Sequence, residues 1–187
     1  MKSDIENALR VLKTGGVILY PTDTVWGIGC DATDAGAVKR IYSIKRRDNA
    51  SAMLVLIDHP GRLNQYVRQV PEIAWQLIEV ADKPLTIIYP SAKNLAENLL
   101  AEDGSVGIRI VKDAFCNELI RRLNRPLVST SANFSGDPAP QVFDEIHPEV
   151  IAGVDHVVQW RQDDLARSWP SGIIKLGQNG EIKIIRE

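Results

Sequence analysis

Residues 106–136 read VGIRIVKDAFCNELIRRLNRPLVSTSANFSG, and this stretch decides the fold class. Residues 106–111 have the composition of a buried strand, residues 113–123 have helical spacing, and residues 126–130 form a second short apolar run. A strand, a helix and a strand in succession are typical of an α/β domain.

The same alternation continues on both sides of this stretch. Upstream, we expect strands at residues 17–20, 52–57 and 85–89. The expected helices begin at a Ser3-x-x-Glu6 capping box, near Asp34 and after Pro71. Downstream, residues 154–158, 172–176 and 181–185 read as strands, and Asn179-Gly180 favours a tight hairpin between the last two. The sequence therefore predicts one α/β domain over residues 1–187, with a mixed sheet.

Composition excludes several classes of protein. The net charge of −2 argues against a globally basic nucleic-acid binder, although a local basic groove stays open. The two cysteines and three histidines show no metal-ligand spacing, so we expect no structural metal. With no signal peptide and no apolar run long enough to span a bilayer, the expected location is cytoplasmic and away from membranes.

Two polar clusters are candidates for binding chemistry. Lys45-x-Arg47 ends a segment with five basic residues and no acidic ones, which we place on the last turn of a helix. Ser131-x-Asn133 follows a strand and is dense in short hydrogen-bonding side chains. The cations suit phosphates and the hydroxyls suit a nucleotide or an amino acid. A solvated helix face and a capped turn explain the same residues equally well.

A charged residue inside a predicted strand is a further candidate for ligand binding. Arg109 interrupts an otherwise apolar run, so it requires a partner or a ligand, unless the strand lies at the edge of the sheet. No histidine or carboxylate is placed to activate a serine in residues 129–135, so covalent serine catalysis is not expected. These serines are better interpreted as ligand-binding residues.

Taken together, the motifs resemble one family, the YrdC/TsaC threonylcarbamoyl-AMP synthases. They occur in the family's order over almost the whole chain, which is more specific than any single motif. The resembling stretches are Pro21-Thr-Asp-Thr-Val-Trp-Gly-Ile-Gly29, Ile41-Tyr-Ser-Ile-Lys-Arg-Arg47, Lys83-Pro-Leu-Thr-Ile-Ile88, Gly107-Ile-Arg109, residues 126–136 and Ser171.

The resemblance implies a fold, a reaction and partners. The fold would be a twisted, mostly open mixed sheet with flanking helices and a large concave cavity. The enzyme would be a nucleotidyltransferase that converts L-threonine, bicarbonate and ATP, the last with Mg²⁺, into threonylcarbamoyl-AMP and pyrophosphate. As a short, single-domain member, it would rely on threonylcarbamoyl-transferase complex proteins to modify tRNA.

The resemblance also assigns residues. The proposed catalytic tetrad is Lys45, Arg47, Ser131 and Asn133. The implied ATP site is formed by that tetrad together with Ser105, Ala139 and Arg186. The implied threonine site is formed by Thr24, Arg109, Ser129 and Ser171.

The sequence departs from the family pattern around these residues. Asp48–Ala52 replaces the usual Pro-Leu after Lys-x-Arg, Trp26 stands for the commoner Tyr, and Ser171-Gly172 replaces Ser-Thr. Two alternatives therefore stay open. One is a module that binds tRNA or other double-stranded RNA, using residues 39–47 with Arg121, Arg122 and Arg125. The other is a carbamoyl-adenylate enzyme with another acceptor.

Overall fold

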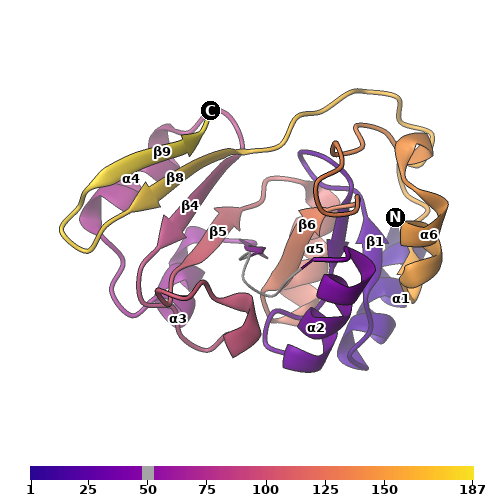
Figure 1. Cartoon of the computed structure of the whole chain (residues 1–187), viewed down its shortest axis with the longest axis horizontal. Coiled ribbons are helices and arrows are strands. Elements are labelled where there is room, and N and C mark those ends of the chain that lie inside the picture. The colour runs from indigo at the N-terminus through magenta and orange to yellow at the C-terminus, as the bar shows by residue number, and fades with distance from the viewer. Residues whose placement is uncertain (48–52) are drawn as a thin grey trace.

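The computed structural model describes residues 1–47 and 53–187 (Figure 1). Within these residues one sheet has the strand order β7-β1-β2-β6-β3-β5-β4-β8-β9. The strands are β1 Ile18–Tyr20, β2 Gly27–Gly29, β3 Leu54–Ile57, β4 Leu85–Tyr89, β5 Val106–Ile110, β6 Leu127–Ser131, β7 His156–Val157, β8 Gly172–Leu176 and β9 Ile182–Arg186. The α-helices are α1 Lys2–Lys13, α2 Ala35–Ile44, α3 Leu63–Tyr66, α4 Glu72–Val80, α5 Ala114–Leu123 and α6 Pro148–Gly153, and 3₁₀ turns span Pro60–Arg62, Glu97–Leu99 and Phe143–Glu145.

The sheet is mixed, as the sequence predicts. β3 runs parallel to β5, β4 to β8 and β1 to β7, while the remaining neighbours are antiparallel. Arg109 of β5 lies between Leu56 of β3 and Thr86 of β4. The alternative that placed Arg109 on an edge strand is therefore wrong.

Apolar side chains cover both faces of the sheet. Val55 and Leu56 are consecutive in β3, so their side chains point to opposite faces. Leu56 joins the cluster formed by the buried sides of α1 and α5, and Val55 joins the larger cluster that includes α2 and part of α4. In Figure 1 the segment between β7 and β8 crosses the top of the molecule, from the α6 side to the β8–β9 hairpin.

Two local expectations need correction. α1 begins after Met1 with no side-chain cap, so the Ser3-x-x-Glu6 capping box is not formed. α2 begins at its Asp34 cap as expected but ends at Ile44, so Lys45, Arg46 and Arg47 follow the helix instead of occupying its last turn. A left-handed φ of 51° at Arg46 turns the chain there.

Strand bounds show smaller differences. β4 and β8 have the expected bounds, whereas β3 begins at Leu54, and Ala52 lies outside the described residues. β2 was not expected, because Gly-Ile-Gly offers few strand-favouring side chains. None of the helices in the described ranges combines the length and the apolar character that a membrane crossing requires.

Candidate active site

A cavity of about 550 Å³ opens over one face of the sheet. Alternate residues of neighbouring strands project into it: Thr86 and Ile88 from β4, Gly107 and Arg109 from β5, and Lys175 from β8. Every residue that the sequence assigns to ATP or threonine lines this cavity, except Lys45. Those lining residues are Thr24, Arg47, Ser105, Arg109, Ser129, Ser131, Asn133, Ala139, Ser171 and Arg186.

Arg109 forms a cationic floor to the cavity. Its side chain is 2% exposed, and its guanidinium donates to Thr24 Oγ1 at 2.9 Å and pairs with Asp23 Oδ1 at 3.2 Å. Its Nε is buried and makes no hydrogen bond within the described residues. Thr24 is itself fixed, because Thr22 Oγ1 lies 3.0 Å from both its backbone nitrogen and its hydroxyl. The fixed arginine is suited to bind a small carboxylate.

A second polar cluster connects β4 with the β8–β9 hairpin. The Thr86 and Ser171 hydroxyls lie 2.8 Å apart, and both side chains are buried. Arg186 donates to the Ser171 carbonyl from Nε at 2.9 Å and from Nη2 at 2.7 Å. Burial, with a smaller contribution from Arg109, lowers the pKa of Arg186. The terminal hairpin thereby adds a third arginine to the cavity wall.

The three consecutive cations after α2 point in three directions. Arg47 lines the cavity. The Arg46 guanidinium lies 4.0 Å from the Phe134 ring centroid and pairs with the exposed Glu149 carboxylate. Lys45 is 2% exposed and donates to the carbonyls of Ser131 at 2.6 Å and Asn133 at 2.8 Å. The two clusters singled out by the sequence are therefore in direct contact, but only Arg47 of the three cations is among the described lining residues.

The chain after β6 is held by its own side chains. Asn133 Nδ2 donates to the carbonyl of Asp137 at 2.7 Å and to that of Phe134 at 3.0 Å. These bonds hold residues 133–137 together beside the cavity, which Asn133, Asp137 and Ala139 line.

Lys175 is a cavity residue that sequence reasoning missed. Its Nζ lies 2.6 Å from Asp103 Oδ2, and the Ser105 backbone nitrogen donates to Asp103 Oδ1 at 3.0 Å. These hydrogen bonds lower the pKa of Asp103 to about 2. Lys175 interrupts the apolar run of β8, just as Arg109 interrupts β5, so the same signal would have found it.

Trp26 and Asp23 were also absent from the assigned sites. Trp26 lines the cavity, and its ring packs 5.0 Å from that of Phe143. Asp23 holds Arg109, and its Oδ2 accepts from the Lys112 backbone nitrogen at 3.2 Å. Both lie in the Pro21–Gly29 motif, whose Pro, Thr and Asp residues are also typical of turns, and from spacing alone a turn is the better interpretation of it.

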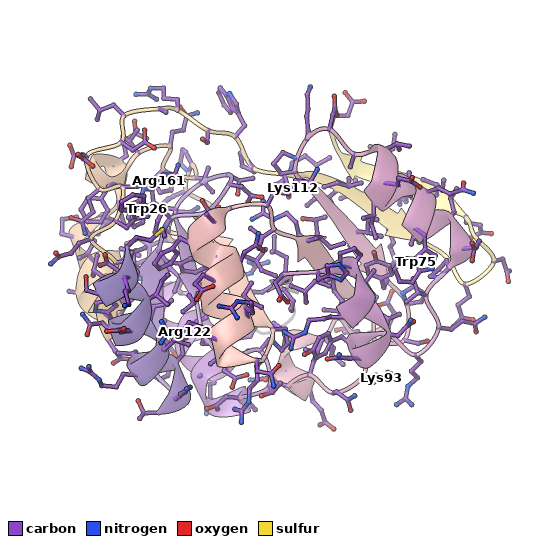
Figure 2. All side chains as sticks on the ribbon, turned by 180° about the vertical axis from the view of Figure 1, so that it is seen from behind. Trp26, Trp75, Lys93, Lys112, Arg122 and Arg161 are labelled. Carbon is purple, nitrogen blue, oxygen red and sulfur yellow. The ribbon has the colours of Figure 1, made fainter. Side chains whose placement is uncertain are left out.

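The basic residues proposed for RNA contacts are partly neutralised. Arg121 forms hydrogen bonds with Glu118, at 2.7 to 3.0 Å, and Arg125 pairs with the buried Asp31 at 2.6 Å. Arg122 lies on α5, on the side of the molecule seen in Figure 2. Among the described residues, no cluster of three or more His, Cys, Asp or Glu side chains is arranged to hold a metal ion.

Comparison with known proteins bears on this geometry. A family model described as Telomere recombination, covering Sua5, YciO and YrdC, matches residues 10–187. The chain belongs to the Sua5/YciO/YrdC family. A family relative from Stenotrophomonas maltophilia named threonylcarbamoyl-AMP synthase is 31% identical over 169 residues, which are 89% of this chain and 91% of that protein.

Solved structures of the Sua5/YciO/YrdC family share the fold. P. abyssi Sua5 complexed with L-threonine superposes with a TM-score of 0.82 at 25% identity, over 92% of this chain. The match covers 50% of the length of that protein. E. coli YciO superposes with a TM-score of 0.86 at 24% identity, over 100% of this chain and 90% of YciO. The expected family and the expected α/β fold are thus confirmed, while the residue roles stay predictions.

Proposed function

We propose that this protein is a threonylcarbamoyl-AMP synthase that uses L-threonine, bicarbonate and ATP. The observation that carries the proposal is the placement of Arg47 and Arg109 in one cavity, which Ser129, Ser131 and Asn133 also line. Relatives that bear this name cover nearly the whole chain. The enzyme class is a transferase of the nucleotidyl type.

Arg109 would bind the carboxylate of threonine. Its guanidinium is already oriented by Thr24 and Asp23, so a carboxylate gains charge-assisted hydrogen bonds without reorganising the floor of the cavity. Ser129 and Ser171 offer hydroxyls nearby, in the wall of the same cavity, for the polar groups of the substrate.

Arg47 would hold the phosphates of ATP, with Ser131 and Asn133 beside it. Ser105, Ala139 and Arg186 complete the proposed nucleotide site in the same cavity. Mg²⁺ would enter with ATP, bound to the triphosphate as part of the substrate. The resemblance gives Lys45 the same phosphate role, but its Nζ donates to two backbone carbonyls.

The chemistry requires no covalent intermediate with the protein. The threonine amine adds to carbon dioxide derived from bicarbonate, and loses a proton to give a carbamate. A carbamate oxygen then attacks the α-phosphorus, and the bond to the bridging oxygen breaks to release pyrophosphate. The described lining residues include neither histidine nor cysteine, and positioning with charge stabilisation suffices for such a transfer.

We further propose that the product passes to threonylcarbamoyl-transferase proteins, which act on tRNA. This destination gives the expected cytoplasmic location. Direct binding of tRNA by this chain is a separate proposal, and steep salt dependence of binding would support it.

The test is pyrophosphate release with labelled bicarbonate and Mg-ATP, with and without threonine. We expect release only when threonine is present, and label in the adenylate product. Serine, valine and alanine in place of threonine would identify another acceptor. Absence of threonine-dependent release, while a known synthase is active alongside, would exclude the proposal.

A further inference from the structure

The Lys45 ammonium donates its hydrogen bonds to the end of β6 and to the chain that follows it. Nζ donates to Ser131 O at 2.6 Å, to Asn133 O at 2.8 Å and, more weakly, to Asn133 Oδ1 at 3.4 Å. An ammonium group has three donors, so these contacts account for all of them. The side chain is buried and is not among the described residues that line the cavity.

The backbone of Lys45 binds the same segment. Its carbonyl accepts from the Ser135 nitrogen at 2.9 Å. Residues 131–135, here called the hydroxyl loop, are therefore joined to residue 45 by both side chain and main chain. Arg46 adds a contact from outside, over the Phe134 ring at 4.0 Å.

We propose that Lys45 is a positioning residue that clamps the hydroxyl loop, and that Arg47 is the cation of this segment that contacts phosphate. Turning Nζ toward a ligand would leave the part-buried Ser131 and Asn133 carbonyls without this donor, and losing a hydrogen bond to a charged group costs free energy. The clamp sets where the Ser131 and Asn133 side chains lie, since both project from the backbone that Lys45 holds.

Charge supports this division of roles. Burial, with Arg47 nearby, lowers the pKa of Lys45 to about 8. The ammonium is therefore still protonated at neutral pH and able to make all three contacts. Loss of the ammonium would loosen the loop without removing the arginine that lines the cavity.

The first test needs no ligand: amide hydrogen exchange of the full chain at pH 7. In Lys45→Met, the amides of residues 132–137 should exchange about tenfold faster than in wild type, corresponding to the loss of roughly one net hydrogen bond. Arg47→Met is the matched control, and its loop should keep wild-type protection. Equal protection in wild type and Lys45→Met would overturn the clamp.

A second variant covers the case in which Lys45→Met does not fold. Lys45→Arg keeps the charge, but a planar fork cannot reproduce three contacts made from one nitrogen. Its loop should also exchange faster, while circular dichroism stays that of wild type. A loop protected as in wild type would again overturn the clamp.

A second test separates the two cations and rests on the proposed function. Calorimetric titration would compare ATP with AMP. Lys45→Met should lower the affinities for ATP and AMP by a similar factor, because both nucleotides bind beside the displaced loop. Arg47→Met should lower the affinity for ATP about tenfold more than the affinity for AMP, because it removes a phosphate contact.

The outcomes of the two tests are distinguishable. If Lys45→Met lost affinity for ATP selectively over AMP, and as strongly as Arg47→Met does, the clamp would be overturned and Lys45 would be a phosphate ligand. If wild type bound neither nucleotide, the proposed function would fail, and hydrogen exchange would still decide the role of Lys45.

Discussion

Arg109 is buried in the middle of the sheet with its guanidinium between Thr24 and Asp23. Replacing it with methionine keeps an extended apolar side chain but removes the cation. We expect threonine affinity to fall about 10- to 150-fold, because a hydrogen bond to a charged group contributes roughly 1.5–3 kcal/mol. ATP affinity should change much less. Separate calorimetric titrations with threonine and ATP would measure both.

Asp23 provides the companion variant at this position. Asp23→Asn keeps the shape of the side chain but removes the negative charge that holds Arg109. Threonine affinity should change in Asp23→Asn, while ATP affinity stays near wild type. If Arg109→Met weakened ATP and threonine equally, Arg109 would not be a specific carboxylate site.

Lys45 gives a prediction about pH. Its pKa is about 8 in the folded protein, against an ordinary value of 10.5. Between these values the unfolded chain binds more protons, so this residue makes folding more favourable as pH rises from about 8 toward 10.5. The difference in free energy of unfolding between wild type and Lys45→Met should therefore grow by about 2 kcal/mol from pH 7 to 9.5.

Urea unfolding of both proteins at the two pH values measures this difference. Buried tyrosines and cysteines with raised pKa values titrate in both proteins, so the comparison cancels their effect. A difference that does not vary with pH would mean that Lys45 keeps its ordinary pKa in the folded state.

At the scale of elements, β2 is where backbone crowding decides the packing. A Cβ on Gly29 would lie 2.4 Å from Val128 O and 2.6 Å from Tyr20 Cε1. Gly29→Ala should lower the free energy of unfolding by about 1–3 kcal/mol, since β1 and β6 must move apart. Gly172→Ala is the control, because its nearest contact would be 3.6 Å. Equal urea midpoints for the two variants would contradict this account.

The same strand marks the limit of what the sequence predicts. Long apolar runs such as Leu85–Tyr89 and Gly172–Leu176 predict their strands to the residue, because side-chain pattern and burial agree. Gly27–Gly29 has no such pattern, and tertiary pairing with β1 and β6 makes it a strand. Strand order is likewise a long-range property that no local window contains.

In the candidate site, too, some features follow from the local sequence and others depend on long-range contacts. Arg109 could be found because a charge in a buried strand requires a partner, and Asp23 is that partner. Lys45 and Arg47 have the same local signal, yet the chain turn at Arg46 sends one to the hydroxyl loop and the other to the cavity. Their different surroundings depend on contacts with residues more than eighty positions away.

At the scale of the whole molecule, the cavity draws its wall from β2 near one end of the chain and from β8 and β9 near the other. A ligand that bridges these strands binds only the folded chain, so binding should stabilise the whole domain. ATP at about a hundred times its dissociation constant adds roughly 2.7 kcal/mol, which corresponds to a rise in Tm of roughly 5–10 °C for a chain of this size. Threonine at the same multiple of its own dissociation constant should raise Tm similarly.

Differential scanning calorimetry of wild type and Arg109→Met then tests whether threonine and ATP bind at different parts of the cavity. At the ligand concentrations used for wild type, Arg109→Met should keep the rise in Tm with ATP and lose most of the rise with threonine, because only the proposed carboxylate site has changed. Loss of both shifts would show that Arg109 supports the cavity as a whole and is not selective for the amino acid.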